Sequence, residues 1–134
     1  MHEWALAQAV LDACEKEGRR QNFKRLTRIT VVLGELQAVD REIVEFAINN
    51  LKKGTLAEGA QFIFQEEKAR FRCRNCGREW GLAERKIEDE QTRELIHFVP
   101  EVSRSFMRCP QCGSPDFEVI EGRGVYIKEL EGED

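Results

Sequence analysis

The chain has 134 residues and a formal net charge of −4 at pH 7, from 21 basic and 25 acidic residues that are evenly mixed. This length suits one ordinary domain, or one domain carrying a small metal-stapled module, and argues against a large multi-element enzyme fold. The mild acidity offers no global field for nucleic acid or anionic lipid. No stretch approaches the roughly 20 apolar residues needed to span a bilayer, and acidic Glu3 is unlike a signal-peptide start. We therefore expect a cytoplasmic protein without a membrane segment.

An amphipathic helix is expected almost from the beginning of the chain. Apolar residues recur at helical spacing from Glu3 to Glu17, and Gly18 follows as the expected C-cap. Cys14 lies close to this apolar face and has no neighbouring cysteine. We interpret it as a buried structural thiol rather than a reactive one.

A strand and a second helix are expected next. Residues 23–36 alternate between apolar and polar side chains and become continuously apolar at 29–33, which is typical of a strand that Gly34 ends or bends. Asp40 is the expected N-cap of the helix that follows. The expected apolar stripe of this helix consists of Ile43, Val44, Ala47, Ile48 and Leu51.

The remaining strands define the expected architecture. Residues 59–67 predict a short strand with Phe62 and Phe64 on one face, and residues 117–131 predict one or two more. The strands near Gln61 and Tyr126 are expected to pair in the core sheet. This order of elements predicts an α+β fold, in which two helices pack on a small mixed β-sheet and the segment between these strands is an inserted zinc-ribbon-like domain.

Four of the five cysteines form two Cys-x-x-Cys-Gly motifs, one at Cys73 and Cys76 and the other at Cys109 and Cys112. The short spacing lets a tight turn aim both sulfurs at one ion, and the glycine permits a left-handed backbone that turns amide N–H groups toward the thiolates. Four thiolates favour a closed, structural zinc site that contributes on the order of 10 kcal/mol to folding. A rubredoxin-like iron site and a redox dithiol are the alternatives.

The two motifs are separated by 32 residues, 77–108, whereas the familiar spacing is about 15 to 20. An extra segment must therefore loop out. Basic side chains flank the cysteines: Arg70, Arg72, Arg74, Arg78, Arg104 and Arg108. Because of these side chains, the alternative function is that of a zinc ribbon that binds nucleic acid or protein. Against it, acidic residues dilute the basic patch, and no run of exposed aromatic residues offers a platform for base stacking.

No enzyme is expected. The sequence has no phosphate-binding loop motif. Its two histidines are the only ones available for a serine–histidine–acid triad, and no such triad is recognised around them. A zinc ion held by four cysteines has no open coordination position for a substrate.

His2 follows Met1 directly. The α-amine of Met1, the deprotonated amide nitrogen of His2 and its imidazole can close adjacent chelate rings around one ion, and a planar nitrogen-rich set suits Ni(II) or Cu(II). The amide of Glu3, or a donor elsewhere, could take the fourth position. His97, the other histidine, is a candidate for that donor, although a packed, hydrogen-bonded side chain is its ordinary alternative. The ordinary alternative for His2 is a solvated tail residue.

The chain resembles the HypA family of hydrogenase maturation factors, which are nickel metallochaperones. The resemblance lies in the Met-His-Glu start, in residues 31–60 and in the two cysteine motifs. The resemblance covers essentially the whole chain, and the long segment between the motifs resembles the archaeal-type variant. It implies nickel as transferred cargo, with His2 as the principal ligand and Glu3 beside it, and a structural zinc ion on the four cysteines. It divides the chain into a nickel-binding domain at 1–69 and 118–134 and a zinc-binding domain at 70–117.

The same resemblance implies partners. Similar proteins pass nickel onward with the nucleotide-hydrolysing protein HypB, toward the large subunit of [NiFe] hydrogenase and, in some bacteria, toward urease. The chain is expected to be a monomer or a homodimer, because the long inserted segment could exchange between protomers.

Overall fold

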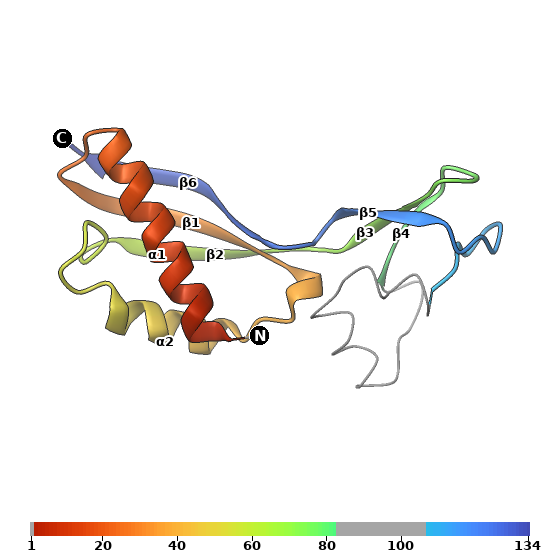
Figure 1. Cartoon of the computed structure of the whole chain (residues 1–134), viewed down its shortest axis with the longest axis horizontal. Helices are drawn as coiled ribbons and strands as arrows, with labels where there is room; N and C mark the ends of the chain where they lie inside the picture. Colours follow the sequence, from red (N-terminus) through yellow and green to blue (C-terminus); the bar gives the residue numbers. More distant parts are fainter. Residues whose placement is uncertain (1, 83–106) are drawn as a thin grey trace. The chain divides into compact units, whose positions relative to one another are not determined.

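The structure is a computed structural model that describes residues 2–82 and 107–134 (Figure 1). Within it the chain forms two compact units. The helical unit comprises Met1–Leu33, Val39–Gln65 and Val125–Asp134. The cysteine unit comprises Gly34–Ala38 and Glu66–Gly124. The helical unit therefore contains both termini, and the cysteine unit is formed largely by the segment inserted between its strands.

Helix α1 spans Glu3–Arg20 and confirms the expected amphipathic helix. The expected C-cap at Gly18 is wrong, because the helix continues and Gly18 is buried within it. Asn22 ends the helix with φ of 62°, while its N–H donates to the carbonyl of Arg19 and the N–H of Phe23 donates to the carbonyl of Gly18. This is the Schellman arrangement with asparagine in place of glycine.

Gly18 has a packing role instead. A methyl group at this position would lie 3.2 Å from side-chain carbons of both Leu26 and Leu56. The absence of a side chain therefore lets the strand and the loop approach the helix closely. Cys14 lies on the same buried face and has no exposed surface. The prediction that this thiol is buried is therefore confirmed.

Helix α2 spans Arg41–Leu51, and its N-cap is Asp40 as expected, because the Asp40 carboxylate accepts the N–H of Ile43 at 3.3 Å. The apolar stripe is narrower than the sequence predicts. Val44, Ala47 and Ile48 are buried, but Ile43 is 42% exposed. The helix packs against the core through the middle of the stripe, so Ile43 at its margin remains exposed to solvent.

The helical unit contains one three-stranded sheet in the order β2-β1-β6, where β1 is Arg25–Gly34, β2 is Gln61–Glu67 and β6 is Val125–Glu133. β1 and β6 are antiparallel, with Ile29 opposite Leu130 and Val31 opposite Ile127. Both strands that flank the insertion join this sheet, but each pairs with β1 and not with the other. The expected pair of helices on a small mixed sheet is confirmed (Figure 1).

One apolar core lies between the helices and this sheet. α1 contacts both α2 and β6, and Phe62 and Phe64 of β2 stack with ring centroids 6.4 Å apart, on one face as predicted. The large buried side chains of this core include Val10, Leu11, Leu26, Ile29, Val31, Leu33, Val44, Ile48 and Phe64. None of the helices in the described ranges is long and apolar enough to cross a membrane.

The cysteine unit has a sheet of its own, of which the sequence predicted only the strand that begins at Phe117. Its strands are β3 (Arg70–Cys73), β4 (Glu79–Gly81) and β5 (Phe117–Glu121), in the order β4-β3-β5 with antiparallel neighbours. A second apolar core includes Leu36, which comes from the short 3-10 helix Glu35–Gln37 between β1 and α2. A residue far from the cysteines in sequence thus completes their hydrophobic support.

Candidate metal centres

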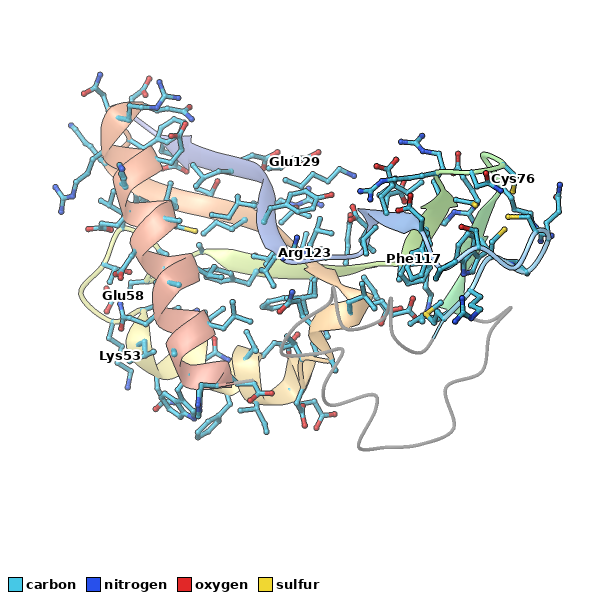
Figure 2. The ribbon with its side chains drawn as sticks, turned by 45° about the vertical axis from the view of Figure 1, so that its right-hand side comes forward. Lys53, Glu58, Cys76, Phe117, Arg123 and Glu129 are labelled. Carbon is cyan, nitrogen blue, oxygen red and sulfur yellow. The ribbon has the colours of Figure 1, made fainter. Side chains whose placement is uncertain are left out.

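The first cysteine motif lies at the end of β3. The Cys73 N–H donates to the carbonyl of Arg78 at 2.8 Å, and the Gly77 N–H donates back to the carbonyl of Cys73 at 3.0 Å. Gly77 has a φ of 80°, in the left-handed region that a side chain would disfavour. The turn therefore folds on itself and holds both thiols on one side, with Cys76 in its outer part (Figure 2).

The second motif repeats this geometry. The Cys109 N–H donates to the carbonyl of Ser114 at 2.9 Å, the Gly113 N–H donates to the carbonyl of Cys109 at 2.9 Å, and Gly113 has a φ of 76°. The left-handed glycine predicted after each pair is confirmed in both motifs. The two turns are thus matched halves of one site.

Backbone N–H groups point at the inner sulfur of each motif. Cys73 Sγ accepts the N–H groups of Asn75 and Cys76, both at 3.4 Å. Cys109 Sγ accepts the N–H groups of Gln111 and Cys112, at 3.4 and 3.5 Å. Because these amide dipoles favour negative charge on sulfur, each turn is prepared for thiolates.

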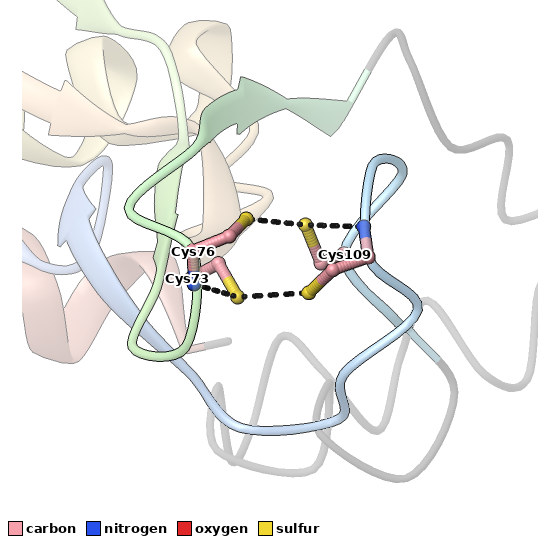
Figure 3. A group of neighbouring side chains, drawn as sticks. Cys73, Cys76 and Cys109 are labelled. Carbon is pink, nitrogen blue, oxygen red and sulfur yellow. Dashed lines mark hydrogen bonds between the residues drawn. The ribbon is translucent and has the colours of Figure 1, made fainter.

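The four sulfurs converge on one point, and all lie within 4.8 Å of one another. The Sγ atoms of Cys73 and Cys112 are 3.6 Å apart, as are those of Cys76 and Cys109 (Figure 3). A disulfide requires about 2.05 Å. Four sulfurs at about 2.3 Å from one tetrahedral ion lie about 3.8 Å from one another. The dimensions therefore fit a single metal ion and not a disulfide pair.

Aromatic packing supports the site from β3, β4 and β5. The rings of Phe71, Trp80 and Phe117 contact one another with centroids 5.3 to 5.7 Å apart, and all three side chains are fully buried. Cys73 and Cys109 belong to the same buried cluster, whereas Cys76 and Cys112 are exposed. Half of the sulfur cluster is thus sealed by the core, and the other half faces solvent.

One exposed thiol has an unusual environment in this arrangement. The side-chain amide of Asn75, followed by the Ser114 backbone N–H, lowers the pKa of Cys112 to about 6. Hydrogen bonds to the charged form have this effect because they stabilise the thiolate over the thiol. The site therefore holds negative charge that a bound cation would neutralise.

Two of the amino-terminal candidates, His2 and Glu3, lie at the start of α1. His2 is the exposed N-cap residue, and its side chain makes no capping hydrogen bond. Glu3 begins the helix, and its Oε2 atom accepts the N–H of Asp40 at 3.2 Å. Met1 and His97 lie outside the described residues, so their predicted roles stay predictions.

Sequence reasoning missed the residues that surround this end of the helix. Asp40 was predicted only as a cap, but its N–H also holds Glu3. Trp4 and Phe46 form an edge-to-face pair with centroids 6.0 Å apart, although they are 45% and 62% exposed. Neither contact joins residues at a local spacing, so no pattern along the chain could have predicted it.

The chain is similar to proteins of one known family. A family model described as "Hydrogenase/urease nickel incorporation, metallochaperone, hypA" matches residues 1–132. Two similar proteins named hydrogenase maturation factor HypA are 56% identical in Pyrococcus horikoshii and 37% identical in Moorella thermoacetica, each over 99% of this chain and at least 99% of its own length.

A solved structure is also similar. The solution structure of the nickel metallochaperone HypA from Helicobacter pylori has a TM-score of 0.66 and 18% identity, over 99% of this chain and 98% of that one. At this identity the likeness concerns the fold. From the family match and the high-identity relatives, the chain belongs to the HypA family, the metallochaperones of hydrogenase and urease nickel incorporation.

Proposed function

We propose that the chain binds Ni(II) at its amino terminus and delivers it during maturation of [NiFe] hydrogenase. The ligands are the α-amine of Met1, the amide nitrogen and imidazole of His2, and the amide nitrogen of Glu3 or a donor elsewhere. One observation carries this proposal: the His2 side chain is exposed and makes no capping hydrogen bond at the start of α1. The imidazole is therefore free to turn toward a metal ion.

The helix terminus also suits amide ligation. The first N–H groups of a helix have no intrahelical acceptor, and His2 and Glu3 are the N-cap and first residue of α1. Their amide nitrogens can lose protons to nickel without breaking a helical hydrogen bond. The first bond along the helix, from the Leu6 N–H to the His2 carbonyl at 3.0 Å, uses the oxygen of His2 and leaves its nitrogen available.

We propose zinc as the ion of the cysteine site. Thiolates favour zinc over hard cations, and four protein ligands complete its tetrahedral shell. Cys73, Cys76, Cys109 and Cys112 would hold it, and the bound ion would join the two turns across their 3.6 Å sulfur pairs. Zinc is thus structural, and nickel is cargo. A rubredoxin-like iron site is the metal alternative, which metal analysis of purified protein separates from zinc.

The remaining parts of the proposal concern delivery. HypB and the large subunit of [NiFe] hydrogenase are the proposed partners, and His97 is the proposed additional donor whose loss favours release. Reduced cysteines suit the cytoplasm, which is the proposed compartment. The protein is proposed to act as a monomer or a homodimer, and native mass spectrometry reports which.

The alternative of a nucleic-acid zinc ribbon depends on free arginines near the cysteines. Arg70 lies 3.7 Å from Glu79, Arg72 lies 2.7 Å from Glu118, and Arg74 lies 3.2 Å from Asp116. These carboxylates neutralise much of the local positive charge, so the arrangement favours the nickel proposal. Salt-dependent retention on DNA or RNA would reverse this preference.

The decisive experiment compares calorimetric nickel titrations of three proteins: the untagged chain, a variant with two residues added before Met1, and a control with the same two residues added after Asp134. The amino-terminal addition turns the Met1 amine into a peptide nitrogen and moves the free amine two residues away from it, so we expect tight nickel binding to disappear while thermal stability is unchanged. The carboxy-terminal addition leaves the chelate intact and should bind normally. His2→Ala should behave like the amino-terminal addition. Undiminished binding in both variants would refute the proposed nickel site.

A further inference from the structure

Asn75 joins the two cysteine turns. Its backbone N–H donates to Cys73 Sγ at 3.4 Å within its own turn, and its side-chain Nδ2 donates to Cys112 Sγ at 3.5 Å in the other turn. Those two sulfurs are one of the close pairs, 3.6 Å apart. A single residue therefore stabilises negative charge on both members of this pair.

The matching position of the second turn is Gln111, and it behaves differently. Its backbone N–H donates to Cys109 Sγ at 3.4 Å, which repeats the role of the Asn75 backbone. Among the described residues, however, its side chain makes no hydrogen bond to Cys76 or to any other group. The site is thus symmetric in its backbone and asymmetric in its side chains.

This asymmetry falls on the two sulfurs that solvent can reach. Cys73 and Cys109 are each only 1% exposed, so a dissolved reagent must approach Cys76 or Cys112. Each of them has a backbone hydrogen bond, from Arg78 to Cys76 and from Ser114 to Cys112. Among the described residues, only Cys112 also accepts a side-chain N–H from an amide, that of Asn75. A hydrogen bond draws electron density from a thiolate and is lost in part when the sulfur forms a new bond, so it slows attack on an electrophile.

We propose that Asn75 protects Cys112, so that Cys76 is the first sulfur of the loaded site to react with soft electrophiles. The inference rests on the proposed zinc site and assigns unequal roles to its four ligands. Modification of Cys76 would open the metal shell at one defined corner while the buried pair still holds the ion. Asn75 is a positioning residue in this scheme, because it acts through Cys112.

The probe is N-ethylmaleimide at a concentration below that of the protein. The thiolate sulfur adds to the maleimide double bond, the neighbouring carbon takes a proton from water, and the resulting thioether is a weak zinc ligand. Peptide mapping by mass spectrometry gives the rate at each cysteine, and a chromogenic chelator follows zinc release. The zinc content of the purified protein is measured first.

In the unmodified sequence we expect Cys76 to be alkylated before Cys112. Asn75→Ala should raise the Cys112 rate about three- to tenfold, the range that corresponds to one net hydrogen bond, with little change at Cys76. The matched control Gln111→Ala keeps its backbone N–H and should leave both rates unchanged. Asn75→Asp, which preserves size but removes the donor, provides a second test if the alanine variant folds poorly.

The outcomes separate this inference from the proposed function. Zinc-loaded protein in which Cys112 reacts first, or in which both Asn75 variants leave the Cys112 rate unchanged, would overturn the role of Asn75 alone. Purified protein without zinc would instead refute the proposed zinc site. The nickel titration depends on neither result.

Discussion

The two candidate metal centres differ in how many contacts of the protein hold the proposed ligands in place. Four backbone N–H groups fix the inner sulfurs of the cysteine site, and a fully buried aromatic cluster supports it. At the start of α1, the polar contacts among the described residues include the helical bond from the Leu6 N–H to the His2 carbonyl and the bond from the Asp40 N–H to Glu3. A preorganised cage suits an ion that stays, whereas ligands on an exposed chain end suit an ion that leaves.

Ligand chemistry follows the same division. Soft thiolates bind zinc tightly, and a closed tetrahedral shell leaves no position for a competing ligand. Nitrogen donors at a chain end can be removed one at a time, and protons compete for each of them. A carrier needs the second arrangement, because a partner must be able to take the ion.

The largest expected effect comes from removing one of the four cysteines of the cysteine site. Cys73→Ser should abolish zinc binding and unfold the cysteine unit, because zinc contributes on the order of 10 kcal/mol to such modules. Trp80 is fully buried in this unit, whereas Trp4 in the helical unit is already 45% exposed. Fluorescence should therefore shift to the red as Trp80 becomes exposed, while far-ultraviolet circular dichroism retains the signal of both helices.

The control for this prediction is Cys14→Ala, which removes a cysteine that lies in the other core. It should keep the full zinc content and the native emission of Trp80. If Cys73→Ser retained zinc and a buried Trp80, the division of roles between the two centres would be wrong.

These expectations show what local patterns can predict. The cysteine site follows from two short motifs, because the turn, the left-handed glycine and the inner N–H···S bonds all form within six residues. The cap at Asp40 is equally local, since its carboxylate accepts the N–H three residues later. Helix α1 and the central strand β1 were predicted from apolar periodicity for the same reason.

Features that depend on distant residues were not predictable in this way. Glycine is a residue typical of helix ends, but Gly18 is required for packing, because Leu26 and Leu56 approach it closely. Leu36 lies next to a strand of the helical unit, yet it is buried in the core of the cysteine unit. The amide of Asn75 reaches a sulfur 37 positions away. Each depends on tertiary packing, which overrides the local signal.

The fifth thiol sharpens the comparison through pH. Burial, with a smaller contribution from the charge of Glu15, raises the pKa of Cys14 to about 12, whereas an unfolded cysteine titrates at about 8.5. Between these values the unfolded chain has lost the proton and the native protein keeps it. The contribution of the protonated Cys14 thiol to the free energy of unfolding is therefore complete below about pH 8.5. Above that pH the contribution declines by about 1.4 kcal/mol per pH unit.

Urea unfolding of the unmodified protein and of Cys14→Ala at pH 7.5 and pH 10 tests this expectation. The unmodified protein should lose more stability than the variant over this interval, because alanine has no proton to release. Parallel losses would show that the thiol is ionisable in the native core.

The smallest effect concerns the contact between Glu3 and Asp40. Glu3→Ala removes the acceptor of the Asp40 N–H and should cost about 1 kcal/mol in unfolding free energy, since the bond is exposed and both groups can reach water. Glu3→Gln retains an oxygen at the same place and should cost less. Nickel affinity should fall by less than tenfold in either variant, because the backbone nitrogens at the helix start are unchanged while only their support is loosened. Calorimetry that instead showed a loss as large as that of the amino-terminal addition would make the Glu3 carboxylate a ligand in its own right, and the amino-terminal centre would then be as dependent on side chains as the cysteine site.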